Sequence, residues 1–369
     1  MRIMITGGGT GGHTSPAVAI IEELQRRDPR LALQWVGRAG GIEERVCRSL
    51  SIPCRGIPVE GWPRVRTWRR TWVLLKLAWC AAWCWVLIKR FRPQLVLGVG
   101  GYVSLPLVWV AQRAGVPTVL HEQNRLLGMA NRICAPRADR ILLSYPDTIG
   151  EYPKAAARLV GNPVRGGFAD PPSPADARES FGLVDGVPVV LVSGGSQGAR
   201  TLNTAMASAL PGFQGDEVQF VWMTGNADAE EARRVAEGAS ARAQVYAYID
   251  DMVGACAAAD LIVSRAGASS TAEIAVMEKP SILVPYPHAA ENHQEQNARA
   301  FEETGAAVVL LDGACTGAAL LETIRALLGD GRRLAAMGDA ARSLARPGAA
   351  EAIVDEILSF VFEESEGAQ

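Results

Sequence analysis

Two glycine-rich segments, each lying between an apolar run and an amphipathic stretch, constrain this chain more than any other feature. Residues 7–13 read GGGTGGH and follow a short apolar run at residues 3–5. Residues 193–199 read SGGSQGA and follow an apolar run at residues 189–192. Glycines at a strand–helix junction let the backbone turn tightly and present the N–H groups of the helix to an anion. The repeated pattern predicts an α/β protein of two domains, each starting at its own strand–glycine–helix unit.

The size and charge of the chain narrow the possible classes. Its 369 residues are enough for about two domains, and its 49% hydrophobic and 21% charged residues are ordinary for a soluble α/β protein. The formal net charge of −2 predicts no nucleic-acid partner. Seven cysteines without a CxxC pair indicate reduced thiols and no zinc site. Glycines follow the N-terminus too soon for the apolar region of a signal peptide.

The alternation of apolar and amphipathic stretches predicts the domain limits. We expect the first domain to cover residues 1–163 and the second to cover residues 164–344. The segment at residues 161–165 (GNPVR) is predicted to be the hinge, because Gly, Asn and Pro favour turns. Near the C-terminus, residues 351–362 have the spacing of an amphipathic helix.

The first glycine segment formally matches the dinucleotide fingerprint GxGxxG. That fingerprint requires an acid at the end of the second strand to bind a ribose hydroxyl, and this chain has Gly37, Arg38 and Ala39 there. No Lys-Ser/Thr pair follows the glycines, which excludes a Walker A loop. A nicotinamide cofactor is therefore not predicted, and the segment instead places a titratable group, His13, at the mouth of a helix.

Residues 62–92, from Trp62 to Arg92, are unusually rich in tryptophan and arginine. No Asp or Glu occurs from residue 61 to 121, and residues 73–88 are apolar apart from Lys76. This apolar stretch is shorter than the roughly 20 residues that span a bilayer. Tryptophan with Lys and Arg at the ends of an apolar helix is typical of an interface with anionic headgroups. A buried core helix is the alternative for residues 73–88, whereas residues 62–70 favour membrane contact.

Polar or small residues follow predicted strands in both halves. Residues 121–124 (HEQN) follow an apolar strand in the first half, and residues 265–273 and 288–297 follow apolar strands in the second. Ligands bind at the carboxyl ends of parallel strands, so these are candidate binding segments. A capping box formed by Ser270 and Glu273 is an alternative explanation for one of them.

Eight short segments run in order nearly from one end of the chain to the other. They read GGGTGGH, LGVGGYVS, VLHEQN, VGNPVR, VSGGSQGAR, YIDDM, SRAGASSTAEIA and ENHQEQNA. Together they resemble the lipid II-forming N-acetylglucosaminyltransferases of bacterial peptidoglycan synthesis, in glycosyltransferase family 28. The resemblance implies a GT-B fold, in which two Rossmann-like domains face each other across a cleft. It also implies that a last helix, at about residues 345–369, packs back on the first domain.

The same resemblance implies an activity. GlcNAc would pass from UDP-GlcNAc to the C4 hydroxyl of MurNAc in lipid I, with inversion at the anomeric carbon, and the product would be lipid II. The enzyme would act as a peripheral protein at the cytoplasmic face of the bacterial plasma membrane. UDP-GlcNAc, lipid I and an anionic membrane surface are therefore the implied partners.

Carried over motif by motif, the resemblance implies a donor site in the second domain. Ile249 would contact uracil through its backbone, and Glu273 would bind the ribose hydroxyls. The diphosphate would meet the helix N–H groups of one segment, which consists of Ala268, Ser269, Ser270, Thr271, Ala272 and Glu273. Ser196 and Arg165 would hold phosphate and the link between the domains.

The sugar and acceptor contacts follow in the same way. Gln294 and Asn124 would bind hydroxyls of GlcNAc, whereas Thr10, Gly11 and Gly12 would face the donor from the acceptor side. Three places differ from the usual family pattern, namely Leu105, the pair Thr14 and Ser15, and His293.

An inverting transfer in one displacement needs a base for the incoming hydroxyl and stabilisation of the departing UDP. We predict His13 as the base, since histidine titrates near neutrality, and Glu122 as its competitor or as the group that orients it. Helix N-termini can stabilise a leaving diphosphate without a metal. The chain has no DxD motif near the donor segments, so neither a metal nor another cofactor is predicted.

Two other functions remain open at this point. A UDP-sugar epimerase or hydrolase has the same two-domain architecture, but it does not need a membrane surface, and the Trp- and Arg-rich segment argues against it. A non-catalytic sugar-nucleotide binding protein would keep the donor site and would transfer nothing.

Overall fold

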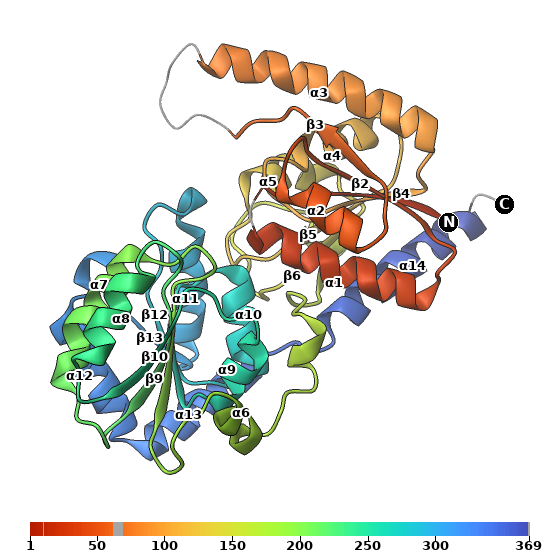
Figure 1. The fold of residues 1–369 in the computed structure, drawn as a ribbon. Helices are drawn as coiled ribbons and strands as arrows, with labels where there is room; N and C mark the ends of the chain where they lie inside the picture. The colour runs from red at the N-terminus through yellow and green to blue at the C-terminus, as the bar shows by residue number, and fades with distance from the viewer. Residues whose placement is uncertain (10, 62–68, 368–369) are drawn as a thin grey trace. The chain divides into compact units, whose positions relative to one another are not determined.

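The computed structural model describes residues 1–9, 11–61 and 69–367, with the backbone alone described for residues 11–13, 69–70, 74 and 362–367 (Figure 1). These residues form two compact units. The first unit contains Met1–Arg165 together with Gly348–Gln369, and the second contains Gly166–Pro347. Each unit is built around its own parallel β-sheet.

The first unit has a seven-stranded parallel sheet in the order β3-β2-β1-β4-β5-β6-β7. Its strands are β1 (Arg2–Thr6), β2 (Ala32–Arg38), β3 (Cys54–Ile57), β4 (Leu95–Gly98), β5 (Thr118–Glu122), β6 (Arg140–Leu143) and β7 (Ala157–Leu159). The strand order reverses between β1 and β4, which pair from Ile3 with Leu95 to Thr6 with Gly98. In a doubly wound sheet, ligands bind at the carboxyl side of such a reversal, so the loops after β1 and β4 line the expected crevice.

Helices cover both faces of this sheet. They are α1 (Gly11–Arg27), α2 (Ile42–Ser49), α3 (Arg69–Phe91), α4 (Leu105–Arg113), α5 (Met129–Cys134), α14 (Ala349–Gly367) and the 3₁₀ turns η1 (Ala135–Arg137) and η2 (Lys154–Ala156). Successive residues of β1 point to opposite faces, so Ile3 packs with α1 whereas Met4 packs with α3 and α4. The last helix, α14, lies beside α1, and Ile357 shares a buried cluster with Ile20 (Figure 1).

The second unit has a six-stranded parallel sheet in the order β10-β9-β8-β11-β12-β13. Its strands are β8 (Val189–Ser193), β9 (Gln219–Met223), β10 (Arg242–Tyr246), β11 (Leu261–Ser264), β12 (Ser281–Leu283) and β13 (Ala307–Val309). The order reverses between β8 and β11, which pair in register from Leu261 with Val190 onward. The second crevice therefore lies where the second glycine segment and residues 265–273 leave the sheet.

The helices of the second unit cover its sheet in the same way. They are α6 (Pro174–Ser180), α7 (Arg200–Ala209), α8 (Ala229–Glu237), α9 (Met252–Ala258), α10 (Ala268–Val276), α11 (His293–Glu303), α12 (Gly317–Leu328) and α13 (Gly331–Leu344), with the 3₁₀ turns η3 (Gly166–Phe168), η4 (Leu210–Gly212), η5 (Ala290–Asn292) and η6 (Asp312–Ala314). Phe220 and Trp222 of β9 are completely buried in the core. Burying each such side chain stabilises the fold by roughly 1.5–3 kcal/mol.

Side-chain caps fix where several of these helices begin. Each capping oxygen accepts a hydrogen bond from the backbone N–H three residues further on, and the capping residues are Ser173 of α6, Asp251 of α9, Thr316 of α12 and Asp330 of α13. Such a cap stabilises its helix by about 1 kcal/mol. α10 has no such cap, because its N-cap is Gly267.

Candidate active site

The glycine segment after β1 lies at the crevice of the first unit. Gly7 and Gly9 have φ angles of 151° and 83°. A Cβ on Gly7 would come within 2.3 Å of Val99 Cγ2 in the loop after β4, and a Cβ on Gly9 would come within 2.9 Å of the ring of Tyr102. Glycine is therefore required here by the close approach of the two loops that flank the crevice.

A buried carboxylate, Glu43 of α2, supports this glycine segment. Its side chain is 0% exposed, and its Oε1 accepts a hydrogen bond from the N–H of Gly9 at 2.5 Å. A Cβ on Gly8 or on Gly41 would come within 2.0 Å of one of its oxygens. An acid thus reaches the glycine segment, where its Oε1 bonds to the backbone and its Oε2 is buried without a partner among the described residues. The sequence pattern did not reveal Glu43, because Gly-Ile-Glu-Glu is an ordinary start of a surface helix.

Glu122, at the end of β5, is held by four hydrogen bonds. Its Oε1 accepts from the backbone N–H and from the side-chain amide of Asn124, both at 3.1 Å. Its Oε2 accepts from the backbone N–H of Gly128 and from the side-chain amide of Asn131, both at 2.9 Å. A carboxylate has about four acceptor positions, and here each oxygen already has two donors. Glu122 therefore holds the loop that follows β5 and is poorly suited to take a proton from a substrate.

His121 and Gln123 are also bonded within the first unit. His121 Nε2 donates to the carbonyl oxygen of Gly161 at 2.9 Å, and His121 Nδ1 accepts from Gln123 Nε2 at 3.0 Å. Gln123 Nε2 also donates to the carbonyl oxygen of Val99 at 2.9 Å. The tautomer that carries its proton on Nε2 satisfies both of these bonds. The polar segment at residues 121–124 therefore ties β5 to the loop after β4 and to the predicted hinge.

The remaining predicted residues of the first unit are described only in part. Thr10 lies outside the described residues. The backbone of Gly11, Gly12 and His13 forms the start of α1. The helix thus begins where the glycine pattern placed it, and His13 belongs to its first turn.

In the second unit, the glycine segment after β8 passes close to the loop after β9. Gly198 has a φ angle of 75°, and a Cβ there would come within 2.0 Å of the carbonyl oxygen of Thr224. Ser196 is exposed in this segment. The hydroxyl of Ser196 is therefore accessible to a ligand, whereas the glycines that follow are fixed by packing.

α10 begins directly after β11, on the other side of the second crevice. Its N-cap is Gly267, which has no side chain to occupy the first N–H groups of the helix. The capping box, the alternative explanation for this segment, does not form, because the helix begins at Ala268 and Ser270 lies inside its first turn. The hydroxyl of Ser269 is buried and has no hydrogen-bond partner among the described residues. A helix start without a side-chain cap, beside an unpartnered hydroxyl, is suited to a phosphate group.

α11 brings Gln294 to the start of α10. Gln294 Oε1 accepts a hydrogen bond from the backbone N–H of Tyr286 at 2.9 Å. Gln294 Nε2 lies 3.9 Å from the position that a Cβ on Gly267 would take. Asn297, one turn further along α11, donates to the carbonyl oxygen of Ala266 at 3.2 Å. The amide nitrogen of Gln294 is therefore held beside the start of α10, while its oxygen is already bonded.

A buried ion pair joins the segments on both sides of the second crevice. Arg265, 8% exposed, donates from Nη1 to Asp312 Oδ1 at 2.5 Å and to the carbonyl oxygens of Val284 and Pro285. Thr201, in the first turn of α7, donates to Asp312 Oδ2 at 3.1 Å. Asp312 therefore anchors the start of α7 and the segment before α10 to the same carboxylate.

Three further residues that the sequence analysis predicted for the donor site lie in different elements. Ile249, 3% exposed, follows β10, and its N–H donates to the sulfur of Met223 at 3.3 Å. Glu273 is partly buried on α10, and Arg165 is exposed at the end of the continuous part of the first unit. The structure brings the segment at residues 268–273 together with Gln294, and it brings Glu122 together with Asn124.

None of the seven cysteines forms a disulfide bond. Burial raises the pKa of Cys84 and of Cys134 to about 12, so these thiols stay protonated. No group of three or more His, Cys, Asp or Glu side chains in the described part of the chain has the arrangement of a metal site.

α3 is buried on one side and exposed on the other. Cys80, Cys84 and Ile88 belong to the core of the first unit. The opposite side carries four apolar residues, spaced three or four apart and between 41% and 67% exposed, which we call the exposed stripe: Trp72, Leu75, Trp79 and Trp83. The buried side has the contacts of a core helix, and the membrane interpretation of residues 73–88 stays a prediction for the exposed stripe.

Cations lie over exposed indole rings on α3 and α4. Lys76 Nζ is 5.6 Å from the ring centroid of Trp72, and Lys89 Nζ is 4.9 Å from that of Trp85. The stretch Thr71–Phe91 is long and apolar enough to cross a membrane, by length and composition only, and 29% of its most apolar window is buried inside the protein. Tryptophan beside Lys and Arg is typical of residues at a membrane interface.

Comparisons with known proteins follow the same division of the chain. Residues 3–143 match the glycosyltransferase family 28 N-terminal domain, and residues 189–353 match the glycosyltransferase family 28 C-terminal domain. A protein of Moorella thermoacetica is 40% identical, over 98% of this chain and 99% of its own length. One of Desulforudis audaxviator is 39% identical, over 97% of this chain and 98% of its own length. Both are named UDP-N-acetylglucosamine–N-acetylmuramyl-(pentapeptide) pyrophosphoryl-undecaprenol N-acetylglucosamine transferase.

Solved structures show the same architecture. MurG of Acinetobacter baumannii, 28% identical, superposes with a TM-score of 0.82 over 97% of this chain and 99% of its own. A UDP-GlcNAc 2-epimerase from Neisseria meningitidis has a TM-score of 0.67 over 97% of this chain and 100% of its own. At 12% identity this second likeness shows the fold alone. The predicted GT-B architecture of two Rossmann-like domains is confirmed.

Proposed function

This chain belongs to glycosyltransferase family 28, and we propose that it transfers GlcNAc from UDP-GlcNAc to the C4 hydroxyl of MurNAc in lipid I, yielding lipid II. The observation that carries this proposal is the 39–40% identity, over nearly the whole chain, with relatives named for this reaction. In the transfer, the bond from the anomeric carbon to the diphosphate breaks and a bond to the C4 oxygen forms with inversion. The hydroxyl proton passes to a base, and UDP leaves.

The donor diphosphate lies at the start of α10 in this proposal. Three features support it, namely the glycine N-cap, the positive end of the helix dipole and the unpartnered hydroxyl of Ser269. Glu273, one turn further on, binds the ribose hydroxyls, and the backbone of Ile249 contacts uracil. Because N–H groups stabilise the departing diphosphate without moving, they act in the transition state as well as in binding.

Gln294 contacts the sugar through its amide nitrogen. Its oxygen accepts from the N–H of Tyr286, so the nitrogen is the part of the side chain that is held toward a ligand. Asn124 is the second sugar contact, and its amide is oriented by the bond to Glu122. Ser196 and Arg165 contribute further polar contacts, and Thr10, Gly11 and Gly12 face the donor from the acceptor side.

His13 is the base in this mechanism. The four donors around Glu122 support this choice, because they leave that carboxylate as a positioning group for Asn124 and the loop after β5. A histidine is neutral in a useful fraction at physiological pH and accepts the hydroxyl proton as the new bond forms. No step of the mechanism requires a metal.

The membrane contact is part of the proposal. The exposed stripe of α3, the cations beside its tryptophans and the absence of Asp and Glu from residue 61 to 121 support peripheral binding to an anionic membrane at its cytoplasmic face. Residues 62–68, which belong to the predicted interface, lie outside the described residues. Vesicle sedimentation tests this contact. Trp72→Ala combined with Trp79→Ala should reduce binding, whereas replacement of another exposed apolar residue of the same unit, Ile149→Ala, should not.

The activity is tested by incubating the full chain with radiolabelled UDP-GlcNAc and a lipid I analogue with a short prenyl chain. The expected result is one labelled β-linked disaccharide product for each UDP released, and no consumption of donor without acceptor. Conversion of UDP-GlcNAc to its 2-epimer, or hydrolysis without acceptor, would support the epimerase or hydrolase instead. Donor binding with no turnover at all would indicate a sugar-nucleotide binding protein.

A further inference from the structure

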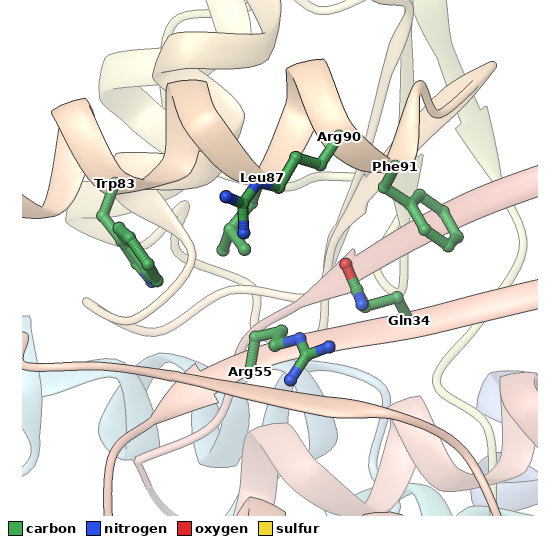
Figure 2. Close-up of a pocket in the computed structure, with 6 residues that line it drawn as sticks. All are labelled: Gln34, Arg55, Trp83, Leu87, Arg90 and Phe91. Atoms are coloured by element: carbon green, nitrogen blue, oxygen red, sulfur yellow. The ribbon is translucent and has the colours of Figure 1, made fainter.

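A cavity of about 310 Å³ lies between α3 and the sheet of the first unit (Figure 2). Six residues from three elements form its wall: Gln34 of β2, Arg55 of the edge strand β3, and Trp83, Leu87, Arg90 and Phe91 of α3. The side chains of Gln34 and Arg55 approach it from the sheet, and the other four approach it from the helix (Figure 2). Small-ligand sites in proteins start at roughly 300 Å³, so the cavity has room for a small group.

The polar groups of this cavity have no partners in the described part of the protein. Gln34 is 7% exposed, and its side-chain amide makes no hydrogen bond with the described residues. Arg55 and Arg90 are exposed residues, and their guanidinium groups form neither a hydrogen bond nor an ion pair with described residues. Two unpaired guanidinium groups and a buried amide therefore surround one space.

The charge around this space favours an anion. None of the six wall residues is acidic, and a further cation of α3, Lys89, directly precedes Arg90 in the sequence. Guanidinium groups bind phosphate oxygens through two parallel hydrogen bonds, a geometry that an ammonium group cannot supply. The amide of Gln34 can donate to a third oxygen or bond to a hydroxyl beside it. A phosphate ester fits this set of donors.

The apolar part of the wall indicates what the phosphate is attached to. Trp83 belongs both to the cavity and to the exposed stripe, so the apolar surface of α3 continues from Trp72 into the cavity wall. Leu87 and Phe91 continue the same wall beyond Trp83. An amphiphile with a phosphate at its polar end matches both parts at once.

We propose that this cavity is a binding site for the headgroup of one anionic phospholipid. The phosphate lies between Arg55 and Arg90, the polar group beyond it meets Gln34, and the upper carbons of the lipid pack on Trp83 and Leu87. The site rests on the membrane contact proposed above and adds to it a discrete, stoichiometric lipid. It differs from diffuse attraction between a basic surface and an anionic membrane, because it depends on the fork geometry of the arginines and on an uncharged amide.

The test changes the hydrogen-bonding geometry of the two arginine side chains and keeps their positive charge. Full-length protein carrying Arg55→Lys with Arg90→Lys is compared with a matched control, Arg45→Lys with Arg48→Lys, two exposed arginines of α2 outside the cavity. Binding is measured by sedimentation with phosphatidylcholine vesicles, with and without phosphatidylglycerol. We expect the cavity variant to lose about tenfold in affinity for the phosphatidylglycerol vesicles, as for loss of bidentate phosphate contacts, with the control unchanged. Gln34→Leu, which alters no charge, should weaken the same preference.

Each other outcome has a distinct meaning. Equal binding of the cavity variant, the control and the wild type would overturn the headgroup site and leave the membrane contact in place. Failure of the wild type to bind either vesicle would overturn the membrane contact itself, and the lipid site with it. Inorganic phosphate that binds in calorimetry with the same dependence on Arg55 and Arg90, and abolishes the vesicle preference, would identify a free-phosphate site instead. Transfer to a water-soluble acceptor should be unchanged in all variants, which separates this test from that of the enzymatic function.

Discussion

Arg265 Nη1 lies 2.5 Å from Asp312 Oδ1, and Thr201 donates to the second oxygen of the same carboxylate at 3.1 Å. The pair connects the two helix starts that flank the crevice of the second unit. We expect Asp312→Asn to lower the free energy of unfolding by about 3 kcal/mol, because Arg265 is left buried without its counter-charge. The KM for UDP-GlcNAc should rise several-fold. Urea denaturation and steady-state kinetics check this, with the exposed Asp185→Asn as control, and unchanged values in both would contradict the anchoring role.

Ser269 allows binding to be separated from stability. Its buried hydroxyl has no partner in the described part of the chain, so Ser269→Ala removes no hydrogen bond of the protein itself. We expect unchanged or slightly higher thermal stability together with about a fivefold weaker affinity for UDP-GlcNAc, the loss of one hydrogen bond to phosphate. Ser281→Ala is the matched control, since the hydroxyl of Ser281 is also buried and unpartnered but lies on β12. If both variants bind UDP-GlcNAc with equal affinity, the diphosphate does not contact Ser269.

Glu122→Gln distinguishes a positioning residue from a base. The variant turns one acceptor oxygen into an NH₂ group that faces two donors, so we expect a loss of about 1–3 kcal/mol in stability. Turnover should fall together with stability, and the pH profile of kcat should keep its acidic limb. If Glu122 is the base, stability stays normal while turnover and the acidic limb both disappear. Calorimetry and a pH series of initial rates decide between these outcomes.

His13→Gln tests the proposed base directly. We expect kcat to fall by about 10²–10⁴, the usual contribution of general base catalysis, with the Kd for UDP-GlcNAc unchanged. The acidic limb of the profile of kcat/KM against pH should be lost as well. Near-normal turnover of this variant would show that another group takes the proton.

Glu23 of α1 should make the free energy of unfolding depend on pH in the acid range. Hydrogen bonds from Arg26 and Arg27 hold the pKa of Glu23 below its usual value. Such a carboxylate stabilises the fold above its unfolded pKa, near 4.3, and the stabilisation is lost as the pH falls through the folded pKa. Glu23→Gln should therefore cost about 1 kcal/mol at neutral pH and nothing at strongly acid pH. The exposed neighbour Glu22→Gln should show no such pH-dependent difference in denaturant titrations.

Much of the architecture was visible in the sequence, because parallel strands buried on both faces give continuous apolar runs. The runs at residues 3–5 and 189–192 became β1 and β8, and each glycine segment proved to lie beside a reversal of strand order. The eight family segments predicted the enzyme class and the GT-B architecture, which the comparisons confirm. The assignment of individual site residues stays a prediction that the experiments above address.

What the sequence did not reveal depends on contacts between distant segments. Asp312 comes 47 residues after Arg265, and nothing in its local pattern marks it as the partner of a buried guanidinium. Glu43 likewise looks like a surface acid until β1 and α2 pack together. The capping box failed for a local reason. The spacing of Ser270 and Glu273 was suitable, but Gly267 allows the helix to start one turn earlier.

The last helix, α14, completes a unit whose other residues lie far upstream. The chain leaves the first unit after Arg165 and returns to it only at Gly348. A ribosome that has released residues 1–165 has therefore not yet made Ile357, which covers Ile20 in the finished protein. Domains usually fold in the order in which they are synthesised. Here the inserted second half can complete its core first, and the N-terminal half must wait, with an apolar surface uncovered, for the final residues to be translated.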